Sequence, residues 1–267
     1  MSTDRAFKGT VDRSLPVLTE KRIVMQPRWQ HLLFLHWVVA PAQLRSFLPP
    51  GLDLDLYEGQ AYVGLIPFTM TGVRPHWAPR FPGRFNYEDF HEINVRTYVH
   101  RAGRYPGVWF FSLDAANALA VRAARVWFKL PYHYARMSLS IGEEEKGRTG
   151  EAERGTSVMD YTSQRSWPGP TPADCALRYR PQGVAAPAQP GTLEHFLVER
   201  YILYSYAGGR LYSGRVHHEP YPLQAARLDA LDENLVSAAG ITRPDEAPLA
   251  HYARGVSVEI FGLERAK

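Results

Sequence analysis

The sequence predicts an α+β fold that is dominated by antiparallel β-sheet. About ten short segments have the pattern of strands, and three or four have the pattern of short helices. Turn-forming residues are frequent, with 21 glycines and 21 prolines among 267 residues. Aromatic residues make up 12% of the chain, which favours β-structure or a pocket with aromatic walls.

Two helices and four strands are expected in the first half of the chain. A helix over 41–48 begins at Pro41 and is stopped by Pro49, Pro50 and Gly51. An apolar period of 3.6 predicts a second helix over 115–127, whose core face would carry Ala116, Leu119, Ala123, Val126 and Trp127. The expected strands are 31–39, 61–73, 92–100 and 108–113, the last two joined as a hairpin. Pro67 within the second strand favours a sheet edge or a bulge.

The second half of the chain predicts further short strands and two short helices. Gly208 and Gly209 mark a hairpin between two of the strands. Thr192 is the expected cap of a helix over 192–200, and Gly240 ends a helix over 232–239. The expected strands are 134–141, 156–164, 176–180, 201–207, 210–217 and 252–263. Loops are expected at 74–87, at the charged tip 142–155 and at much of the proline-rich segment 165–190.

The length of the chain allows one domain, and we expect a single domain over 1–267. Residues 1–20 are expected to form a loose extension, and their polar start predicts no secretory signal. The segment 165–190 is interpreted as an excursion within this domain. No apolar run is long enough for a membrane-spanning helix. The single cysteine, Cys175, excludes an internal disulfide and fits a cytoplasmic protein.

The charge pattern does not indicate a nucleic-acid-binding protein. The formal net charge is +4, but the arginines are scattered singly and no basic run or recognition motif is present. Fingerprints of nucleotide, zinc-protease and α/β-hydrolase sites are also absent. We therefore expect a small-molecule partner, no membrane, no metal and no cofactor, and self-association into a homo-oligomer stays open.

The segment 91–96 is the first candidate site. Strand alternation places Glu92, Asn94 and Arg96 on one face and Ile93 and Val95 on the other. The polar face either meets water or lines the pocket of a closed barrel. In the second case Glu92 is a proton carrier, and Asn94 and Arg96 bind substrate.

Two further segments offer proton-transferring groups. Tyr132 and His133 follow Pro131, where the chain passes from helix to strand, and they are either catalytic groups or an aromatic plug. His217 and His218 adjoin each other near a strand end and point to opposite faces, so they cannot easily share a metal. His218 is kept as a candidate substrate-binding residue.

Several of these segments together resemble the YqjF-like family of uncharacterised bacterial proteins. The resemblance covers nearly the whole chain. It is carried by the segments Leu48 to Leu52, Phe90 to Val99, Gly107 to Ala115, Glu199 to Tyr201 and His218 to Pro220.

The order of these elements also looks like acetoacetate decarboxylase, which implies a cone-shaped β-barrel with a few short helices. In that family a lysine pair follows a proline, and its first lysine forms a Schiff base. The matching stretch here has Tyr132 and His133 instead. The family's pocket glutamate matches Glu92, whereas its pocket arginine falls near Trp37 or Val38. Lys129 is then the nearest lysine, two residues before Pro131 and three before the matching position, Tyr132.

Three functions remain open at this point. The first is an enzyme, lyase-like or isomerase-like, that performs acid–base chemistry on a small carbonyl or carboxylate compound without an imine. Glu92 and His133 would carry protons, Tyr132 would donate to an oxyanion and Arg96 would anchor a carboxylate. The second is a non-catalytic binder of an apolar small molecule. The third, an interaction scaffold, has no motif in its support.

Overall fold

The computed structural model describes residues 9–14, 23–73, 89–143 and 157–266. The described helices are α1 (Pro41–Arg45), α2 (Ala118–Trp127), α3 (Leu193–Val198) and α4 (Leu235–Ala238). The described strands are β1 (Ile23–Met25), β2 (Arg28–Val39), β3 (Asp53–Leu54), β4 (Ala61–Thr71), β5 (Phe90–Arg101), β6 (Arg104–Ala115), β7 (Tyr132–Glu143), β8 (Ser157–Trp167), β9 (Asp174–Ala186), β10 (Ile202–Ala207), β11 (Arg210–His218), β12 (Leu223–Glu233), β13 (Leu249–Phe261) and β14 (Glu264–Arg265). The prediction of a mostly antiparallel sheet with a few short helices is confirmed. Among the described strands, two pairs are parallel, β6 with β7 and β6 with β10, and the other pairs are antiparallel.

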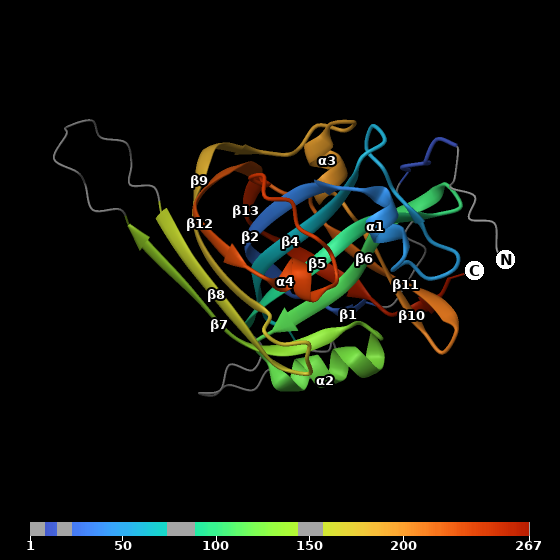
Figure 1. The fold of residues 1–267 in the computed structure, drawn as a ribbon, viewed down its shortest axis with the longest axis horizontal. Coiled ribbons are helices and arrows are strands. Elements are labelled where there is room, and N and C mark those ends of the chain that lie inside the picture. Colours follow the sequence, from blue (N-terminus) through green and yellow to red (C-terminus); the bar gives the residue numbers. More distant parts are fainter. Residues whose placement is uncertain (1–8, 15–22, 74–88, 144–156, 267) are drawn as a thin grey trace.

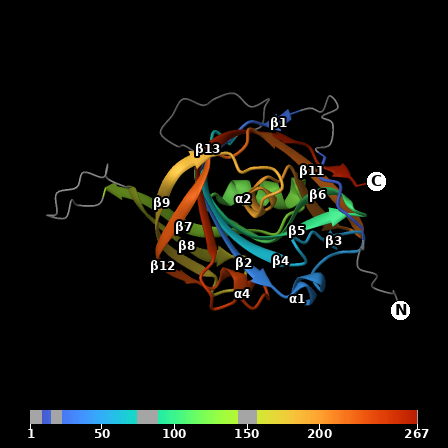
Figure 2. The ribbon, with the colours of Figure 1, turned by 90° about the horizontal axis from the view of Figure 1, so that it is seen from above.

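Strand pairing closes this sheet on itself (Figure 2). Strands β13, β2, β4, β5 and β6 follow one another as a shared wall. Two routes then lead from β6 back to β13. One runs through β7, β8, β9 and β12, and the other runs through β10 and β11. The wall therefore belongs to two closed rings of strands, one on each of its faces.

Gly107 permits the pairing of β6 with β10, with which the second route begins. β10 joins β6 beside Gly107, where an added Cβ would lie 2.6 Å from the carbonyl oxygen of Ile202. A side chain at this position would push the two backbones apart. The close approach of β6 and β10 thus depends on the absence of a side chain at Gly107.

The two faces of the wall are buried differently. On one face, Leu33 and Leu35 of β2 and Ile93 and Val95 of β5 pack into a filled core with residues of β8 and β9 such as Tyr161. On the other face, a second apolar cluster lies between the wall, α2 and α3. Figure 1 shows α2 at one end of the strands and α3 at the other, and in Figure 2 α2 lies across the middle of the ring.

Of the two alternatives expected at Pro67, a sheet edge or a bulge, the structure has a bulge, and its extra residue lies in the neighbouring strand β2. Gln30 pairs with Thr69 and Leu35 with Leu65, so β2 has one residue more than β4 over this stretch. Pro67 lies in a central strand, where a bulge accommodates the ladder bond that a proline nitrogen cannot donate.

Some element boundaries differ from the sequence predictions. Strand β12 was not expected, and its last residues, Asp232 and Glu233, pair with β9 at the point where a helix was predicted to begin. Helix α4 is therefore only Leu235–Ala238. The segment 165–190 contains all of β9, and β7 begins at Tyr132, two residues earlier than predicted. The loop 74–87 lies outside the described residues, as does the tip from 144 to 155.

The expected core face of the second helix is wrong in part. In α2, Leu119, Val126 and Trp127 are 64%, 69% and 60% exposed, and Val121 is the buried residue. Leu119 and Trp127 border a cavity, and their exposed fractions place them at its open edge. They remain accessible since the helix lies over an open space rather than on a filled core.

Within residues 1–20, the part described is 9–14. Arg13 donates two hydrogen bonds of 2.8 Å to the carboxylate of Asp55, and Arg200 donates a third of 2.6 Å to the same carboxylate. This segment therefore contacts the body of the chain. None of the described helices is long and apolar enough to cross a membrane.

Candidate functional site

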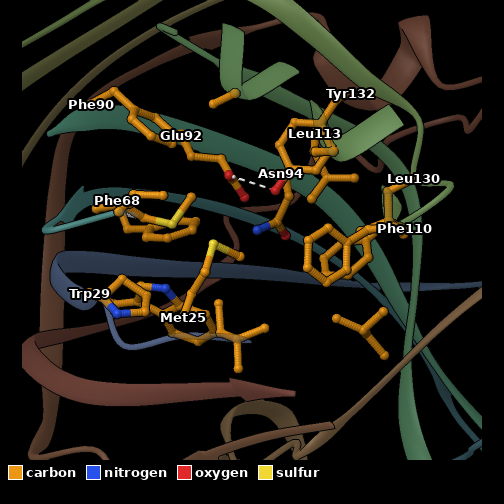
Figure 3. A pocket seen from close by; sticks show the side chains of 18 of the residues that line it. Met25, Trp29, Phe68, Phe90, Glu92, Asn94, Phe110, Leu113, Leu130 and Tyr132 are labelled. Carbon is orange, nitrogen blue, oxygen red and sulfur yellow. Dashed lines mark hydrogen bonds between the residues drawn. The ribbon is translucent and has the colours of Figure 1, made fainter. Parts of the chain in front are cut away.

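A cavity of about 370 Å³ lies on the α2 side of the shared wall (Figure 3). Most of its walls are apolar side chains from β1, β2, β4, β5, β6 and α2, and β10, β11 and β13 complete it. The principal aromatic and sulfur-containing residues are Met25, Trp29, Phe68, Met70, Phe90 and Phe110. Few polar side chains reach this space, so each of them is a candidate for ligand recognition.

Strand β5 supplies three of the polar side chains. Glu92, Asn94 and Arg96 alternate along the strand and line the cavity. Ile93 and Val95, between them, point into the filled core on the opposite face. The alternation in the sequence predicted this arrangement on the condition that a second sheet layer covers the apolar face, and β8 and β9 form that layer.

Glu92 and Tyr132 form a hydrogen-bonded pair inside the cavity. The Tyr132 hydroxyl donates to Glu92 Oε2 over 2.9 Å, and Glu92 is 2% exposed (Figure 3). Burial raises the pKa of Glu92 to about 8, the hydrogen bond from Tyr132 opposes this rise, and the nearby Asp114 adds to it. Burial, together with Glu92, also raises the pKa of Tyr132 well above its ordinary value. At neutral pH both groups therefore carry a proton.

Backbone contacts hold this pair in place. Arg125 Nη1 at the end of α2 donates to the Tyr132 carbonyl oxygen over 2.6 Å. The Tyr161 hydroxyl, which comes from the filled core, donates to the Glu92 carbonyl oxygen over 2.9 Å. Helix α2 and strand β8 thus fix the two catalytic candidates from opposite sides of the wall.

Arg96 lies four residues along β5 from Glu92 and leans away from it. Its Nη2 donates to the carbonyl oxygen of Leu197 in α3 over 3.3 Å. The guanidinium also lies over the rings of Phe34 and Tyr98, at 5.8 and 5.7 Å from their centroids. Within the described ranges no carboxylate forms an ion pair with Arg96, and the side chain is partly accessible.

His133 lies away from the cavity. It follows Tyr132 in β7, and adjacent strand residues point to opposite faces, so the two cannot both face Glu92. His133 Nδ1 is 2.6 Å from the Pro168 carbonyl oxygen, near the buried ion pair of Arg165 and Asp114. Burial lowers the pKa of His133 to about 4. The expectation that Tyr132 or His133 shares a cavity with Glu92 is met by Tyr132.

His218 lies behind the cavity wall. Its ring is 4.4 Å from the ring of Tyr221, which does line the cavity, and 4.7 Å from that of Tyr201. His217 is exposed on the other face of β11, as strand alternation predicts. Across the described segments, no group of three metal-ligating side chains occurs.

The sequence analysis missed the apolar half of the site. Trp29 and Phe110 line the cavity, and so do Leu119 and Trp127 on α2. The high aromatic content was the one general signal for them. Their gathering depends on the pairing of β2 with β13 and of β6 with β10, which local sequence does not indicate.

Lys129 does not enter this cavity. It has a positive φ of 54° just after α2, and its Nζ lies 5.1 Å from the ring centroid of Tyr212. Lys129 lines a different, more open depression, beside Phe111 and Tyr206. No lysine is found among the described residues that line the cavity of Glu92.

The sequence profile of DUF2071, described as an uncharacterised conserved protein, matches residues 26–257. The chain belongs to this family. It is also 37% identical, over 242 residues, to the uncharacterised protein YqjF of Bacillus subtilis (strain 168), which covers 91% of this chain and 92% of that protein. The resemblance to the YqjF-like family is confirmed.

Solved structures place the fold among acetoacetate decarboxylase-like proteins. MppR, an enduracididine biosynthesis enzyme solved in complex with pyruvate, has a TM-score of 0.58 at 17% identity over 96% of this chain and 98% of its own. An acetoacetate decarboxylase-like enzyme from Sphingomonas wittichii RW1 has a TM-score of 0.58 at 13% identity, over 97% and 99%. Acetoacetate decarboxylase from Legionella pneumophila has a TM-score of 0.56 at 12% identity, over 96% and 92%. At these identities the likeness concerns the fold.

Proposed function

We propose that this DUF2071 protein is an enzyme that moves a proton on a small carbonyl compound without forming an imine. The observation that carries the proposal is the hydrogen bond of 2.9 Å between Tyr132 and a fully buried Glu92 in an apolar cavity. A carboxyl group whose pKa is about 8 exchanges protons readily near neutral pH.

The two side chains have separate roles in this proposal. The ionised form of Glu92 takes a proton from the carbon next to the substrate carbonyl. The carbonyl oxygen then gains negative charge, and the Tyr132 hydroxyl, whose one O–H donates to Glu92 Oε2 before the transfer, turns to donate to this oxygen once Glu92 is protonated. Glu92 returns the proton to the same carbon or, where a carbon–carbon double bond adjoins that carbon, to the far carbon of this bond, so the enzyme is unchanged after each cycle. Return to the far carbon moves the double bond and is an isomerisation, which agrees with the isomerase-like activity expected from the sequence.

Hydrogen exchange tests this role directly. A panel of ketones and 2-oxo acids is incubated with the protein in D₂O, and loss of the α-proton signals is followed by NMR. We expect exchange faster than in buffer for at least one compound. Because the base form of Glu92 is needed, the rate rises with pH, reaches half of its limit near pH 8 and levels off at higher pH.

Matched variants decide whether Glu92 is responsible. Glu92→Gln keeps the shape but cannot accept the proton, and we expect loss of exchange by about 10²-fold or more. His133→Gln, on the opposite face of β7, is expected to exchange at the wild-type rate. Exchange that survives in Glu92→Gln would contradict the proposal, and so would bound compounds that show no exchange at any pH.

The alternative is a non-catalytic binder of an apolar small molecule. The wall composition favours it, because six of the lining residues are Met25, Trp29, Phe68, Met70, Phe90 and Phe110. A protein that binds apolar compounds tightly and exchanges none of their protons would support this alternative.

A further inference from the structure

The charge in the cavity constrains the ligand. Of the described lining residues, Arg96 is the one cation and Glu92 is the one carboxyl group. Glu92 keeps its proton below a pH of about 8, so the enclosure holds one positive charge near neutral pH. A cation in an apolar enclosure is costly unless an anion accompanies it. A ligand with a single negative charge provides that anion.

Arg96 is held in a position to receive such a group. Its Nη2 is fixed to the Leu197 carbonyl oxygen and its plane is packed over two aromatic rings. In the part of the chain that the structure describes, Nη1 has no hydrogen-bond partner. The fork of a guanidinium suits a carboxylate, and the packing means that little side-chain freedom is lost on binding.

The distance along β5 sets the length of the ligand. Residues 92 and 96 are four apart in an extended strand, which separates their Cα atoms by about 13 Å. The two side chains diverge further, because Arg96 contacts α3 whereas Glu92 contacts the start of β7. Asn94 lies between them on the strand, and the surface facing it is apolar, with Trp29 and Met25 across the cavity (Figure 3). A two-carbon or four-carbon acid cannot reach both ends.

We propose that the cavity binds an elongated carboxylic acid whose carboxylate pairs with Arg96 and whose apolar body extends along β5 to Glu92. If Glu92 transfers protons as proposed above, the reacting carbonyl lies at the far end of this body, several carbons from the carboxylate. The binding claim itself concerns Arg96 and the apolar walls and does not require a reaction.

Calorimetry with simple amphiphiles tests the binding claim. The probes are the alkanoates from butanoate to dodecanoate, together with octanol, octyl phosphate and octyltrimethylammonium. We expect the affinity to rise about fourfold for each added methylene until the cavity is full. Octanoate should bind about tenfold more tightly than octanol, since a charge-assisted hydrogen bond is gained. The cationic probe should bind most weakly, and octyl phosphate should not exceed octanoate.

Variants at Arg96 locate the carboxylate. In Arg96→Met, which keeps the length but removes the charge, the preference for octanoate over octanol should vanish while octanol binds as before. Arg96→Lys should keep the preference, and Glu92→Gln should keep it fully. If Arg96→Met does not fold by circular dichroism, the wild-type series and Arg96→Lys still decide the claim. An octanol affinity equal to that of octanoate in the wild type would overturn it, as would affinities that do not depend on length.

The outcomes separate the two proposals. If acids bind with a length-dependent affinity and no proton exchange occurs, the proposed reaction is contradicted and the proposed ligand class is supported. If a small ketone exchanges its protons and acids do not bind with a length-dependent affinity, the proposed ligand class is contradicted and the proposed reaction is supported.

Discussion

A carboxyl group that keeps its proton at neutral pH lowers the stability of the chain that carries it. Glu92 loses its hydration inside apolar walls, and the single hydrogen bond from Tyr132 does not replace that hydration. Its pKa is about 8 in the folded chain, against an ordinary value near 4.5. Between these two pH values the unfolded chain is ionised at this position while the folded chain binds a proton. Stability therefore falls as the pH rises from about 4.5 to about 8, and it is constant above.

Replacement of Glu92 should remove this pH dependence. In Glu92→Gln the side chain is neutral in both states, so the variant should gain stability relative to the wild type as the pH rises from 5 to 8. The gain should reach several kcal/mol, because each pKa unit corresponds to about 1.4 kcal/mol. Urea unfolding at a series of pH values measures it. The exposed Asp245→Asn is the control, and a constant difference between Glu92→Gln and the wild type would contradict the raised pKa.

Tyr132 sets how far the pKa of Glu92 rises. Its hydroxyl donates to the carboxylate and so favours the ionised form, which holds the pKa below the value that burial alone would give. In Tyr132→Phe the pKa of Glu92 should rise above about 8. The infrared carboxyl band of labelled glutamate follows this titration, with Tyr206→Phe as the matched control. A midpoint that stays in place or moves to lower pH would show that Tyr132 does not donate to Glu92.

At the scale of elements, the close approach of β6 and β10 depends on Gly107. A Cβ there would lie 2.6 Å from the Ile202 carbonyl oxygen, so Gly107→Ala must displace one of the two backbones. We expect a loss of about 1–3 kcal/mol in the free energy of unfolding. Gly142→Ala is the control, since an added Cβ at Gly142 meets nothing within 4 Å. Equal stability of the two variants in urea unfolding would show that the junction tolerates a side chain.

Local patterns predicted some elements well. The double glycine at 208–209 predicted the β10–β11 hairpin, and alternation in β5 predicted the face on which Glu92 lies. Strand β12 was missed because its alanines, leucines and charged residues suit a helix equally well. Its pairing with β9 decides the matter, and that pairing joins segments far apart in the sequence. The position of His133 was missed for a related reason, since starting β7 at Tyr132 turns His133 away from the cavity.

At the scale of the whole molecule, the fold is acetoacetate decarboxylase-like, but the described lining of the Glu92 cavity contains no amine that could form an imine. The sequence predicted the fold through resemblance to known families. It could not predict that two rings of strands share one wall. The pairs β13–β2 and β6–β10 join segments that are far apart in the sequence, and no local pattern indicates such pairing. The cavity beside that wall holds a carboxyl group, a phenol and a guanidinium, and none of these forms an imine with a ketone.

Treatment with borohydride in the presence of acetoacetate should therefore leave the mass of the protein unchanged. An imine requires a neutral primary amine within reach of the ketone, and the described lining of the Glu92 cavity contains none. Lys129, the nearest lysine in sequence, directs its Nζ to the ring of Tyr212 instead. Intact-mass spectrometry gives the result, with an acetoacetate decarboxylase treated in parallel to show that trapping works. A stable adduct mapped to Lys129, and absent from Lys129→Arg, would mean that this side chain turns into the cavity and would restore the Schiff-base mechanism.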